Sequence, residues 1–259
     1  MQVLAIASQR GNVGKTSTAC ALSLGLRENG YRVLSIDLDP QADLSHMYGI
    51  DADAEGISST QDVISGAELS DVIVPTMLGD VAPAGIGLSC ADMQMMTLGA
   101  ERILSDTLVQ VAGSYDYAVI DTPPNLGILA WNALYACTAA LVVTSPGAYR
   151  ANDFPLLSQT FSTIRRSFNP SFKVMGAVLT RVSASRENEE ELVGTIEKAA
   201  HEANFTLMGT RVREGCGTRV ASEMANQFNG TVRLPRDYAD LTQEVIRYFD
   251  ALSKKRMLG

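Results

Sequence analysis

The segment from Ser8 to Ser17 reads SQRGNVGKTS, and its residue types are those that hold phosphate groups. It follows an apolar run at residues 3–7 and precedes a stretch of helical composition, which is the context that a phosphate-binding loop requires. In such a loop, backbone N–H groups and the N-terminus of the following helix hold the phosphate oxygens. We therefore predict a nucleotide site whose contacts come from consecutive residues of this loop: Arg10, Gly11, Asn12, Val13, Gly14, Lys15, Thr16 and Ser17.

Three side chains of the loop have separate tasks in the predicted site. Lys15 reaches the β- and γ-phosphates and serves hydrolysis, the Thr16 hydroxyl binds Mg²⁺, and Ser17 faces the α-phosphate. The alternative is a chance Gly-Lys-Thr sequence at the start of a helix, and the apolar run before the loop disfavours it.

The elements that must position this loop follow from an alternation of apolar runs and helical stretches. Short aliphatic runs predict buried strands at residues 3–7, 33–36, 118–120, 140–144 and 174–179. Spacing and composition predict helices at residues 15–29, 125–137, 153–168 and 187–203, and a final helix from about Asp237. This alternation predicts an α/β fold with a doubly wound, mostly parallel sheet, helices on both faces, and ligands at the carboxyl ends of the strands.

Residues 49–92 are less regular than the rest of the chain and contain scattered Gly and Pro residues. We expect them to be an insertion within one P-loop domain that spans residues 1–259. Because the first strand starts near residue 3, we expect no N-terminal helix-turn-helix and no sequence-specific binding to an operator.

The composition is typical of a globular protein, with 46% apolar and 19% charged residues. No apolar run approaches the roughly 18 residues of a membrane span, and no export signal is visible, so we expect a cytoplasmic location and no membrane partner. The two histidines stand alone, which argues against a zinc site. The cysteines form no CxxC pair, as in a reduced cytosolic protein: Cys20, Cys90, Cys137 and Cys216.

Charge is distributed unevenly along the chain, whose net charge is −8. Residues 1–149 hold 5 Lys or Arg against 16 Asp or Glu, whereas residues 150–259 hold 16 against 13. This asymmetry indicates a localised basic face, and ordinary solvated helix surfaces are the alternative explanation.

Several ordered motifs resemble those of the ParA/Soj family of partition ATPases, which also includes the cell-division ATPase MinD. Gln9 stands where the common phosphate loop has glycine, and the match is to a deviant loop, xKGGxGK[ST], with Arg10 in place of its first lysine. Segment 33–41 resembles the family's DxDPQ motif, and segment 117–127 resembles its magnesium-binding strand and switch II. Residues 179–181 resemble a later strand end at the base pocket. The resemblance covers nearly the whole chain and implies ATP and Mg²⁺ as the cofactors.

Each acidic residue of these motifs has an expected role. Asp121 ends an apolar strand and is expected to meet Mg²⁺ through a water, as the acidic residue of this strand does in P-loop NTPases. Asp37 lies at a strand end and is expected to steady the magnesium shell. The resemblance implies that Asp39 orients or activates the water that attacks ATP. The alternative is that Asp37 and Asp39 cap a helix that begins near Gln41.

Two loop residues depart from the family pattern. Arg10 stands where the family has a lysine that reaches across a dimer to the partner's nucleotide, and the resemblance implies the same catalytic role for its guanidinium. Asn12 replaces a glycine, and asparagine is among the few residues that adopt a left-handed backbone. The resemblance also implies that Thr180 and Arg181 contact the base, with a plain structural role as the alternative.

The resemblance implies an ATPase that forms a homodimer when ATP is bound and acts in partition of a chromosome or plasmid. It further implies nonspecific DNA binding by the ATP dimer, a nucleoid-associated location, and stimulation of slow hydrolysis by a ParB-like centromere-binding partner. Candidate DNA contacts are basic residues of the second half: Arg165, Arg166, Arg186, Arg211, Arg213, Arg219, Arg233 and Arg236.

Three other functions stay open. A MinD-like positioning ATPase would need an amphipathic C-terminal anchor, and residues 251–259 have charge but little apolar face. A metabolic P-loop enzyme, such as a carboxylase-type synthetase or a small-molecule kinase, would need a second substrate pocket, which the sequence does not locate. A regulatory protein with slow turnover is compatible with Arg10 and Asn12.

Overall fold

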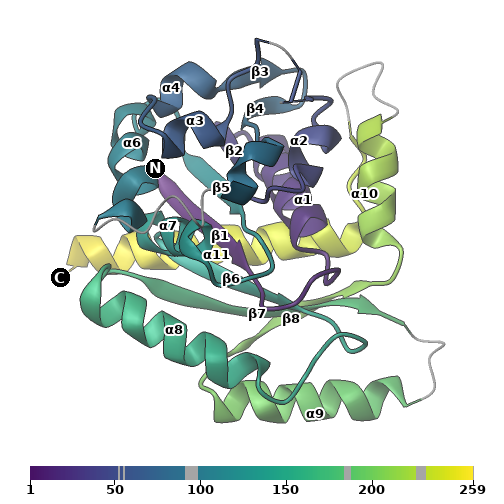
Figure 1. The fold of residues 1–259 in the computed structure, drawn as a ribbon. Coiled ribbons are helices and arrows are strands. Elements are labelled where there is room, and N and C mark those ends of the chain that lie inside the picture. The colour runs from purple at the N-terminus through teal and green to yellow at the C-terminus, as the bar shows by residue number, and fades with distance from the viewer. Residues whose placement is uncertain (52, 55, 91–98, 184–187, 226–231, 259) are drawn as a thin grey trace.

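A central β-sheet forms the core of the fold. The computed structural model describes residues 1–51, 53–54, 56–90, 99–183, 188–225 and 232–258. Its strands are β1 (Gln2–Ala7), β2 (Val33–Asp37), β3 (Val74–Thr76), β4 (Gly79–Ala82), β5 (Tyr117–Asp121), β6 (Ala139–Thr144), β7 (Lys173–Val182) and β8 (Leu207–Arg213). They form one sheet in the order β3-β4-β2-β5-β1-β6-β7-β8 (Figure 1). The described pairings are parallel except β3–β4, which confirms the predicted fold class.

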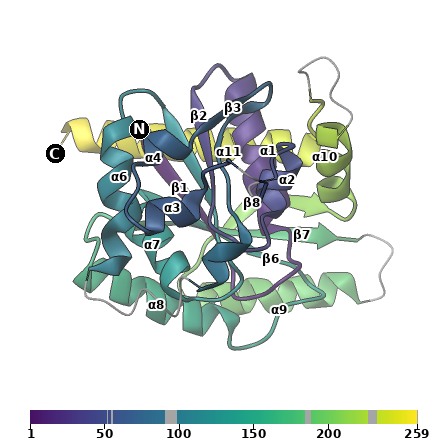
Figure 2. The ribbon, with the colours of Figure 1, turned by 45° about the horizontal axis from the view of Figure 1, so that its top comes forward.

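Helices cover both faces of this sheet (Figure 2). One face packs against α1 (Lys15–Glu28), α2 (Asp43–Met47), α10 (Cys216–Ala225) and α11 (Arg236–Leu258). The other face packs against α3 (Thr60–Ile64), α4 (Leu69–Val72), α6 (Ile103–Val111), α7 (Ile128–Ala136), α8 (Asp153–Ser167) and α9 (Glu189–Glu202). Short 3₁₀ turns are η1 (Ile86–Cys90) and η2 (Ala100–Arg102).

Strand β1 shows how its sequence serves two cores at once. Leu4 and Ile6 belong to the core with α1 and α11, whereas Val3, Ala5 and Ala7 belong to the core with α6, α7 and α8. The alternation has the period of two that a strand imposes. Because both faces are covered, the strand reads as a continuous apolar run, which is why it was predictable.

The helix after β5 starts later than its composition predicts. The pattern indicates a helix from residue 125, but α7 begins at Ile128, after Gly127 in an extended conformation. Pro123 and Pro124 stand between β5 and this helix, and their fixed φ angles leave a stiff turn. The residues after Asp121 therefore form a loop over the carboxyl ends of the strands.

The segment at residues 49–92 is more regular than its sequence indicates. It supplies β4, which pairs in parallel with β2, and β3, which pairs antiparallel with β4. These strands are only three and four residues long, too short for a periodic pattern to stand out. Part of the expected insertion thus extends the central sheet.

Two elements of the second half are also absent from the sequence-based expectations. Edge strand β8 mixes exposed polar and partly buried residues, so its sequence lacks the apolar run of a central strand. Helix α10 follows it directly after Gly215, whose φ is +84°. None of the helices in the described ranges combines the length and apolarity needed to cross a bilayer.

Candidate functional site

A cavity of about 230 Å³ opens at the carboxyl ends of β1, β2 and β5. It brings together residues that are far apart in the sequence: Gly11, Asn12, Gly14, Lys15, Thr16, Ser17, Asp39, Gln41, Asp43, Pro124 and Arg181. The loop between β1 and α1 forms one wall, and the segment after β2 forms another. Most of the predicted site residues therefore line one hollow.

The loop depends on two residues with left-handed backbones. Asn12 has φ +57°, so asparagine does adopt the conformation expected at this position. Gly14 has φ +87°, where an L side chain would be strained, although space for a Cβ exists beside Thr180. The conformation, not crowding, therefore accounts for glycine before Lys15.

Lys15 begins helix α1 and is 94% buried. Its Nζ donates a hydrogen bond to the backbone oxygen of Arg10 at 3.2 Å, across the mouth of the loop. Burial lowers the pKa of Lys15, while the negative charges of Asp121 and Asp39 raise it. The ammonium group is thus held inside the loop, in reach of an anion that enters the cavity.

Asp121 ends strand β5 and is completely buried. Neither oxygen of its carboxylate has a hydrogen-bond partner within the described part of the chain. Burial raises its pKa well above the ordinary value, and the neighbouring carboxylate of Asp37 raises it further. The nearby Thr16 hydroxyl and Lys15 act in the opposite direction, although the hydroxyl does not complete a hydrogen bond.

This carboxylate fits a divalent cation. A buried carboxylate with free lone pairs costs free energy until a positive charge or donor meets it. Within the described ranges, no group of three or more acidic, His or Cys side chains could hold a metal by itself. Mg²⁺ in phosphate-loop sites needs no such group, because it takes oxygens from phosphates, waters and one hydroxyl of the loop, the part predicted for Thr16.

Asp37 is bound on both oxygens. Its Oδ1 accepts from the Asp39 backbone N–H at 3.0 Å, and its Oδ2 accepts from the N–H and the hydroxyl of Ser45 at 2.9 and 2.7 Å. Burial raises its pKa to about 6, against these hydrogen bonds. The expected part of Asp37 in the magnesium shell stays a prediction, because the contacts it makes are structural.

The helix-capping alternative is half right. Helix α2 begins at Asp43 rather than near Gln41, and its N-cap residue is Ala42, whose methyl group accepts no hydrogen bond. Asp37 caps α2 instead, because its carboxylate accepts from the N–H of Ser45, the third residue of that helix. Asp39 instead accepts from the Gln41 N–H at 3.0 Å, in the turn that precedes the helix.

Asp39 lies against the phosphate cavity with 9% of its surface exposed. Burial raises its pKa and the charge of Asp43 raises it further, while the Gln41 N–H and Lys15 lower it. Gln41, the last residue of the segment that resembles DxDPQ, lines the same cavity, as does Asp43, which the sequence patterns did not single out. Their place two and four residues after Asp39 was the available signal.

Arg10 is paired within its own chain. Its Nε and Nη2 donate to Asp153 Oδ1 at 2.9 and 2.7 Å, and Asp153 is the first residue of α8. Asp153 Oδ2 accepts from the Arg150 N–H at 2.9 Å. The Arg10 side chain is 42% exposed and does not line the phosphate cavity of its own chain.

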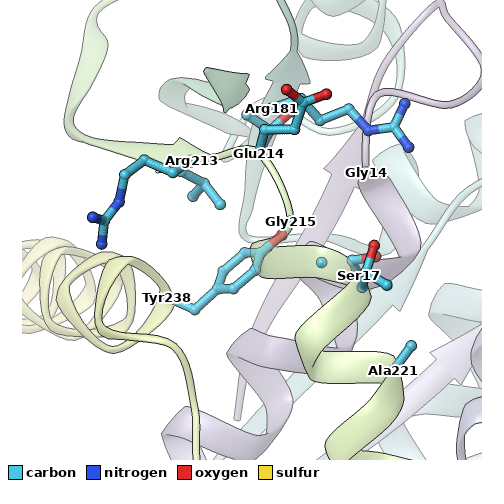
Figure 3. A pocket seen from close by; sticks show the side chains of 12 residues that line it. Gly14, Ser17, Arg181, Arg213, Glu214, Gly215, Ala221 and Tyr238 are labelled. Carbon is cyan, nitrogen blue, oxygen red and sulfur yellow. The ribbon is translucent and has the colours of Figure 1, made fainter. Parts of the chain in front are cut away.

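A second cavity, of about 500 Å³, adjoins the first (Figure 3). It is lined by Gly14, Ser17, Thr180, Arg181, Val212, Arg213, Glu214, Gly215, Gly217, Thr218, Ala221 and Tyr238. Figure 3 shows the Arg181 guanidinium on the side of Gly14, whereas Arg213 points away from the hollow. The phosphate loop and the strand end at residues 179–181 thus share one continuous groove.

Thr180 supports the phosphate loop directly. Its hydroxyl is buried and lies 2.5 Å from the backbone oxygen of Val13 and 3.1 Å from that of Thr144. A hydroxyl carries one proton, so these carbonyls occupy its donor function. Thr180 and Arg181 line the second cavity, and their contact with a base stays a prediction, which for Thr180 is limited to accepting a hydrogen bond.

The segment from β8 into α10 is the part of the groove that the sequence did not indicate. Gly217 lets α10 approach α1, because a Cβ there would lie 2.9 Å from the Ser17 hydroxyl oxygen. Tyr238 of α11 closes the groove, with its hydroxyl 3.3 Å from that of Thr18. The Gly-Cys-Gly sequence at residues 215–217 was the only local hint.

Known proteins resemble the chain over most of its length. The family model described as AAA domain matches residues 1–174. The chromosome partitioning protein ParA of Caulobacter vibrioides is 35% identical over 198 residues, which cover 74% of this chain and 74% of that protein. The sporulation initiation inhibitor protein Soj of Bacillus subtilis is 32% identical over 202 residues, with 76% and 79% coverage.

A solved structure resembles the fold closely. The crystal structure of cobyrinic acid a,c-diamide synthase from Mycobacterium smegmatis, with a bound ATP analog and magnesium, superposes with a TM-score of 0.83. Its sequence identity to this chain is 27%, and the match covers 96% of each chain.

Proposed function

The chain belongs to the ParA/Soj family of P-loop ATPases, and from this premise we propose that it binds ATP with Mg²⁺ and hydrolyses the γ-phosphate bond. The observation that carries the proposal is the carboxylate of Asp121, buried beside Thr16 and Lys15 without a hydrogen-bond partner in the described structure. A bound metal would give the Asp121 carboxylate a cationic partner, and a triphosphate would give the Lys15 ammonium an anionic partner.

Each residue of the phosphate cavity has a defined part in the proposed reaction. Lys15 exchanges its bond to the Arg10 carbonyl for the β- and γ-phosphates, and loop N–H groups bind the remaining oxygens. Thr16 and Asp121 would hold the metal, which would neutralise phosphate charge when bound. Asp39, at the cavity wall, orients the attacking water.

We further propose that two ATP-bound copies form a dimer in which Arg10 meets the partner's phosphates. Arg10 lines no part of its own phosphate cavity, and its partly exposed guanidinium is paired with the buried carboxylate of Asp153. A partner's triphosphate offers a stronger anion than one carboxylate, so dimer formation would draw Arg10 from Asp153. The ion pair between Arg10 and Asp153 would thus be present in the monomer and absent from the ATP-bound dimer.

The dimer is proposed to bind DNA without sequence preference, as an ATPase of chromosome or plasmid partition. Arg211, Arg213 and Arg236 form ion pairs with Glu197, Asp237 and Asp240, so they are poorer candidates for phosphate contacts. Among these candidates, Arg166, Arg219 and Arg233 are exposed, and their side chains have no ion-pair or hydrogen-bond partner in the described ranges. Arg165 donates to the Phe172 carbonyl, and Arg186 lies outside the described residues.

Arg219 and Arg233 make the best candidate contacts. Arg219 lies on α10, which lines the second cavity, and Arg233 lies three residues before α11, whereas Arg166 is the next-to-last residue of α8. A DNA surface beside the groove can respond to bound ATP. Stimulation by a ParB-like partner completes the proposal, and the family membership supports it.

A second candidate is an ATP-dependent small-molecule enzyme, which one observation favours. A third hollow, of about 410 Å³, lies between α2 and α10 and is lined by Thr16, Ser17, Asp43, His46, Met47, Ala221 and Ala225. This is a second pocket beside the phosphate loop, as such an enzyme requires. The likeness to cobyrinic acid a,c-diamide synthase points the same way.

DNA binding separates these functions. We expect a fluorescent duplex of arbitrary sequence to bind with ATP and Mg²⁺ but not with ADP, and to release at high salt. Replacing Arg219 and Arg233 together with alanine should reduce the log–log salt slope by roughly 0.9 per lost phosphate contact. Arg166→Ala is the matched control and should leave the slope unchanged. Absence of binding at low salt would favour the enzyme or a protein-positioning role.

A further inference from the structure

Ser45 joins two parts of the molecule behind the phosphate cavity. It is fully buried in α2, and its hydroxyl donates to Asp37 Oδ2 at 2.7 Å while accepting from the Ala84 N–H at 2.8 Å. Its own backbone N–H donates to the same oxygen of Asp37 at 2.9 Å. Two donors on one oxygen restrict how the carboxylate can turn.

The other oxygen of Asp37 fixes the backbone of Asp39. It accepts from the Asp39 N–H at 3.0 Å, and Asp39 then accepts from the Gln41 N–H with its own side chain. The orientation of Asp39 therefore depends on the orientation of the Asp37 carboxylate. That orientation depends in turn on Ser45.

We propose that Ser45 is a positioning residue for ATP hydrolysis, because it holds the Asp37 carboxylate and thereby places Asp39 at the wall of the phosphate cavity. The inference rests on the proposed ATPase function for its effect on turnover. Its effect on the loop at residues 38–42 is independent of that function.

Asp37 needs such a restraint because a second buried carboxylate lies beside it. Asp37 and Asp121 are register partners at the ends of the paired strands β2 and β5, and both are fully buried. Two buried carboxylates on neighbouring strands repel each other unless hydrogen-bond donors or cations compensate their charge. Without the Ser45 hydroxyl, Asp37 keeps only one donor on Oδ2 and can turn, which would release the Asp39 N–H.

The corner that follows β4 keeps Ser45 itself in place. Thr60 donates its hydroxyl to the Asp37 backbone oxygen at 2.8 Å, and its N–H donates to the Pro83 carbonyl at 2.7 Å. The next residue, Ala84, donates to the Ser45 hydroxyl. Residues of the segment at 49–92 thus stabilise Asp37 and Ser45, and through them the loop at residues 38–42.

Ser35 provides a matched control on the same strand. It lies on β2 two residues before Asp37, is 99% buried, and its hydroxyl is 2.7 Å from that of Tyr48. Ser35→Ala removes a buried hydroxyl and its hydrogen bond to Tyr48 but touches no carboxylate, whereas Ser45→Ala removes two hydrogen bonds, one of them to Asp37. Both changes leave a buried polar partner without its hydrogen bond, so both should lower the temperature of thermal unfolding.

The test compares Ser45→Ala, Ser45→Thr and Ser35→Ala in the full chain. Amide hydrogen exchange at Asp39 and Gln41 reports the loop, and single-turnover and steady-state phosphate release report hydrolysis. We expect Ser45→Ala to speed exchange at both amides and to lower kcat about tenfold or more, with ATP affinity within about twofold, since misplacement near 1 Å can cost about 10²-fold. Ser45→Thr should restore both, and Ser35→Ala should change neither.

The outcomes are distinct. Unchanged exchange in Ser45→Ala, or equal exchange in Ser35→Ala, overturns the positioning role. Faster exchange with normal kcat overturns its link to hydrolysis. Faster exchange confined to Ser45→Ala, in a chain whose parent hydrolyses no ATP, supports the positioning of Asp39 and counts against the ATPase function. Should Ser45→Ala fail to fold, Ser45→Cys, which fills the same space but donates weakly, replaces it with the same expectations.

Discussion

The two cavities of the groove are built in different ways: the first is the phosphate side, and the second, which we propose to take the base, is named the base side. On the phosphate side, residues 11–17 and the ends of β2 and β5 converge because they are consecutive in sequence or adjacent in the sheet. On the base side, the lining comes from β7, β8, α10 and α11, as far along the chain as Tyr238. Backbone geometry defines the first region, and side-chain packing between remote elements defines the second.

The two regions also differ in how they carry charge. Lys15, Asp37 and Asp121 are almost wholly buried on the phosphate side, whereas the ion pair at the base side joins Arg213, which is 67% exposed, to Asp237. Buried charges lower stability unless a ligand of opposite charge binds them, and exposed ion pairs contribute little to stability. Substitutions on the phosphate side should therefore change function strongly, and those on the base side should change affinity or stability modestly.

The largest effect is expected from Asp39→Ala. Loss of the group that orients water should lower turnover about 10²- to 10⁴-fold, measured by phosphate release, while ATP still binds. The ATP-bound dimer should then accumulate on a sizing column. Normal turnover would instead reduce Asp39 to the acceptor that closes the turn at Gln41.

Lys15→Ala tests the phosphate side through affinity. Removing a buried ammonium from charge-assisted bonds should weaken ATP binding about 10- to 100-fold by calorimetry, with an unchanged circular dichroism spectrum. Lys198→Ala, on the exposed surface of α9, is the control and should bind ATP as the parent does. Equal affinity in both variants would mean that the loop does not hold phosphates.

Arg10 lines neither cavity of its own chain, so substituting it tests whether a partner subunit contributes to the phosphate side. Arg10→Ala should keep monomer ATP affinity but weaken ATP-dependent dimerisation about tenfold and lower turnover, and Arg10→Lys should restore both. Asp153→Asn should favour the dimer, because it releases the guanidinium. Analytical ultracentrifugation with and without ATP measures each. A dimer unaffected by Arg10→Ala excludes the contribution in trans.

A pair of variants separates the two regions directly. Thr180→Val removes the hydroxyl that binds the Val13 carbonyl, so it should weaken ATP and inorganic tripolyphosphate alike, by about fivefold. Ala221→Phe fills the base side and should weaken ATP alone. If Thr180→Val spares tripolyphosphate, Thr180 acts on the base rather than on the loop.

The smallest expected effect concerns pH and the base side. The hydrogen bonds from Arg213 lower the pKa of Asp237 to about 2, below its ordinary value of 3.8. Because the pKa of Asp237 is lower in the folded state, its ion pair with Arg213 stabilises the fold fully at pH values above 3.8. This stabilisation is lost as the pH falls toward 2. Thermal unfolding should therefore show Asp237→Asn less stable than the parent by about 1 kcal/mol or less at neutral pH. The gap should close in acid, and a gap that persists would point to packing instead.

The limits of prediction follow the same division. The phosphate loop, the central strands and helices α1, α8, α9 and α11 were predicted from sequence within a few residues, since each depends on local spacing or an apolar run. Strands β3, β4 and β8 were not, because short or edge strands mix polar and apolar residues. The role of Ser45 was also beyond reach, since its partners Asp37 and Ala84 stand 8 and 39 positions away.

The sequence by itself determined the class of site, because a phosphate loop is a local structure whose contacts are backbone groups of consecutive residues. It also determined the position of Asp121, because an acidic residue that ends a buried strand must lie at the carboxyl edge of the sheet. Three contacts could be found only in the folded chain: Arg10 pairs with Asp153, Thr180 supports the loop, and Asp37 caps α2. Those contacts join segments whose distance in space depends on how whole elements pack, and no local pattern records that distance.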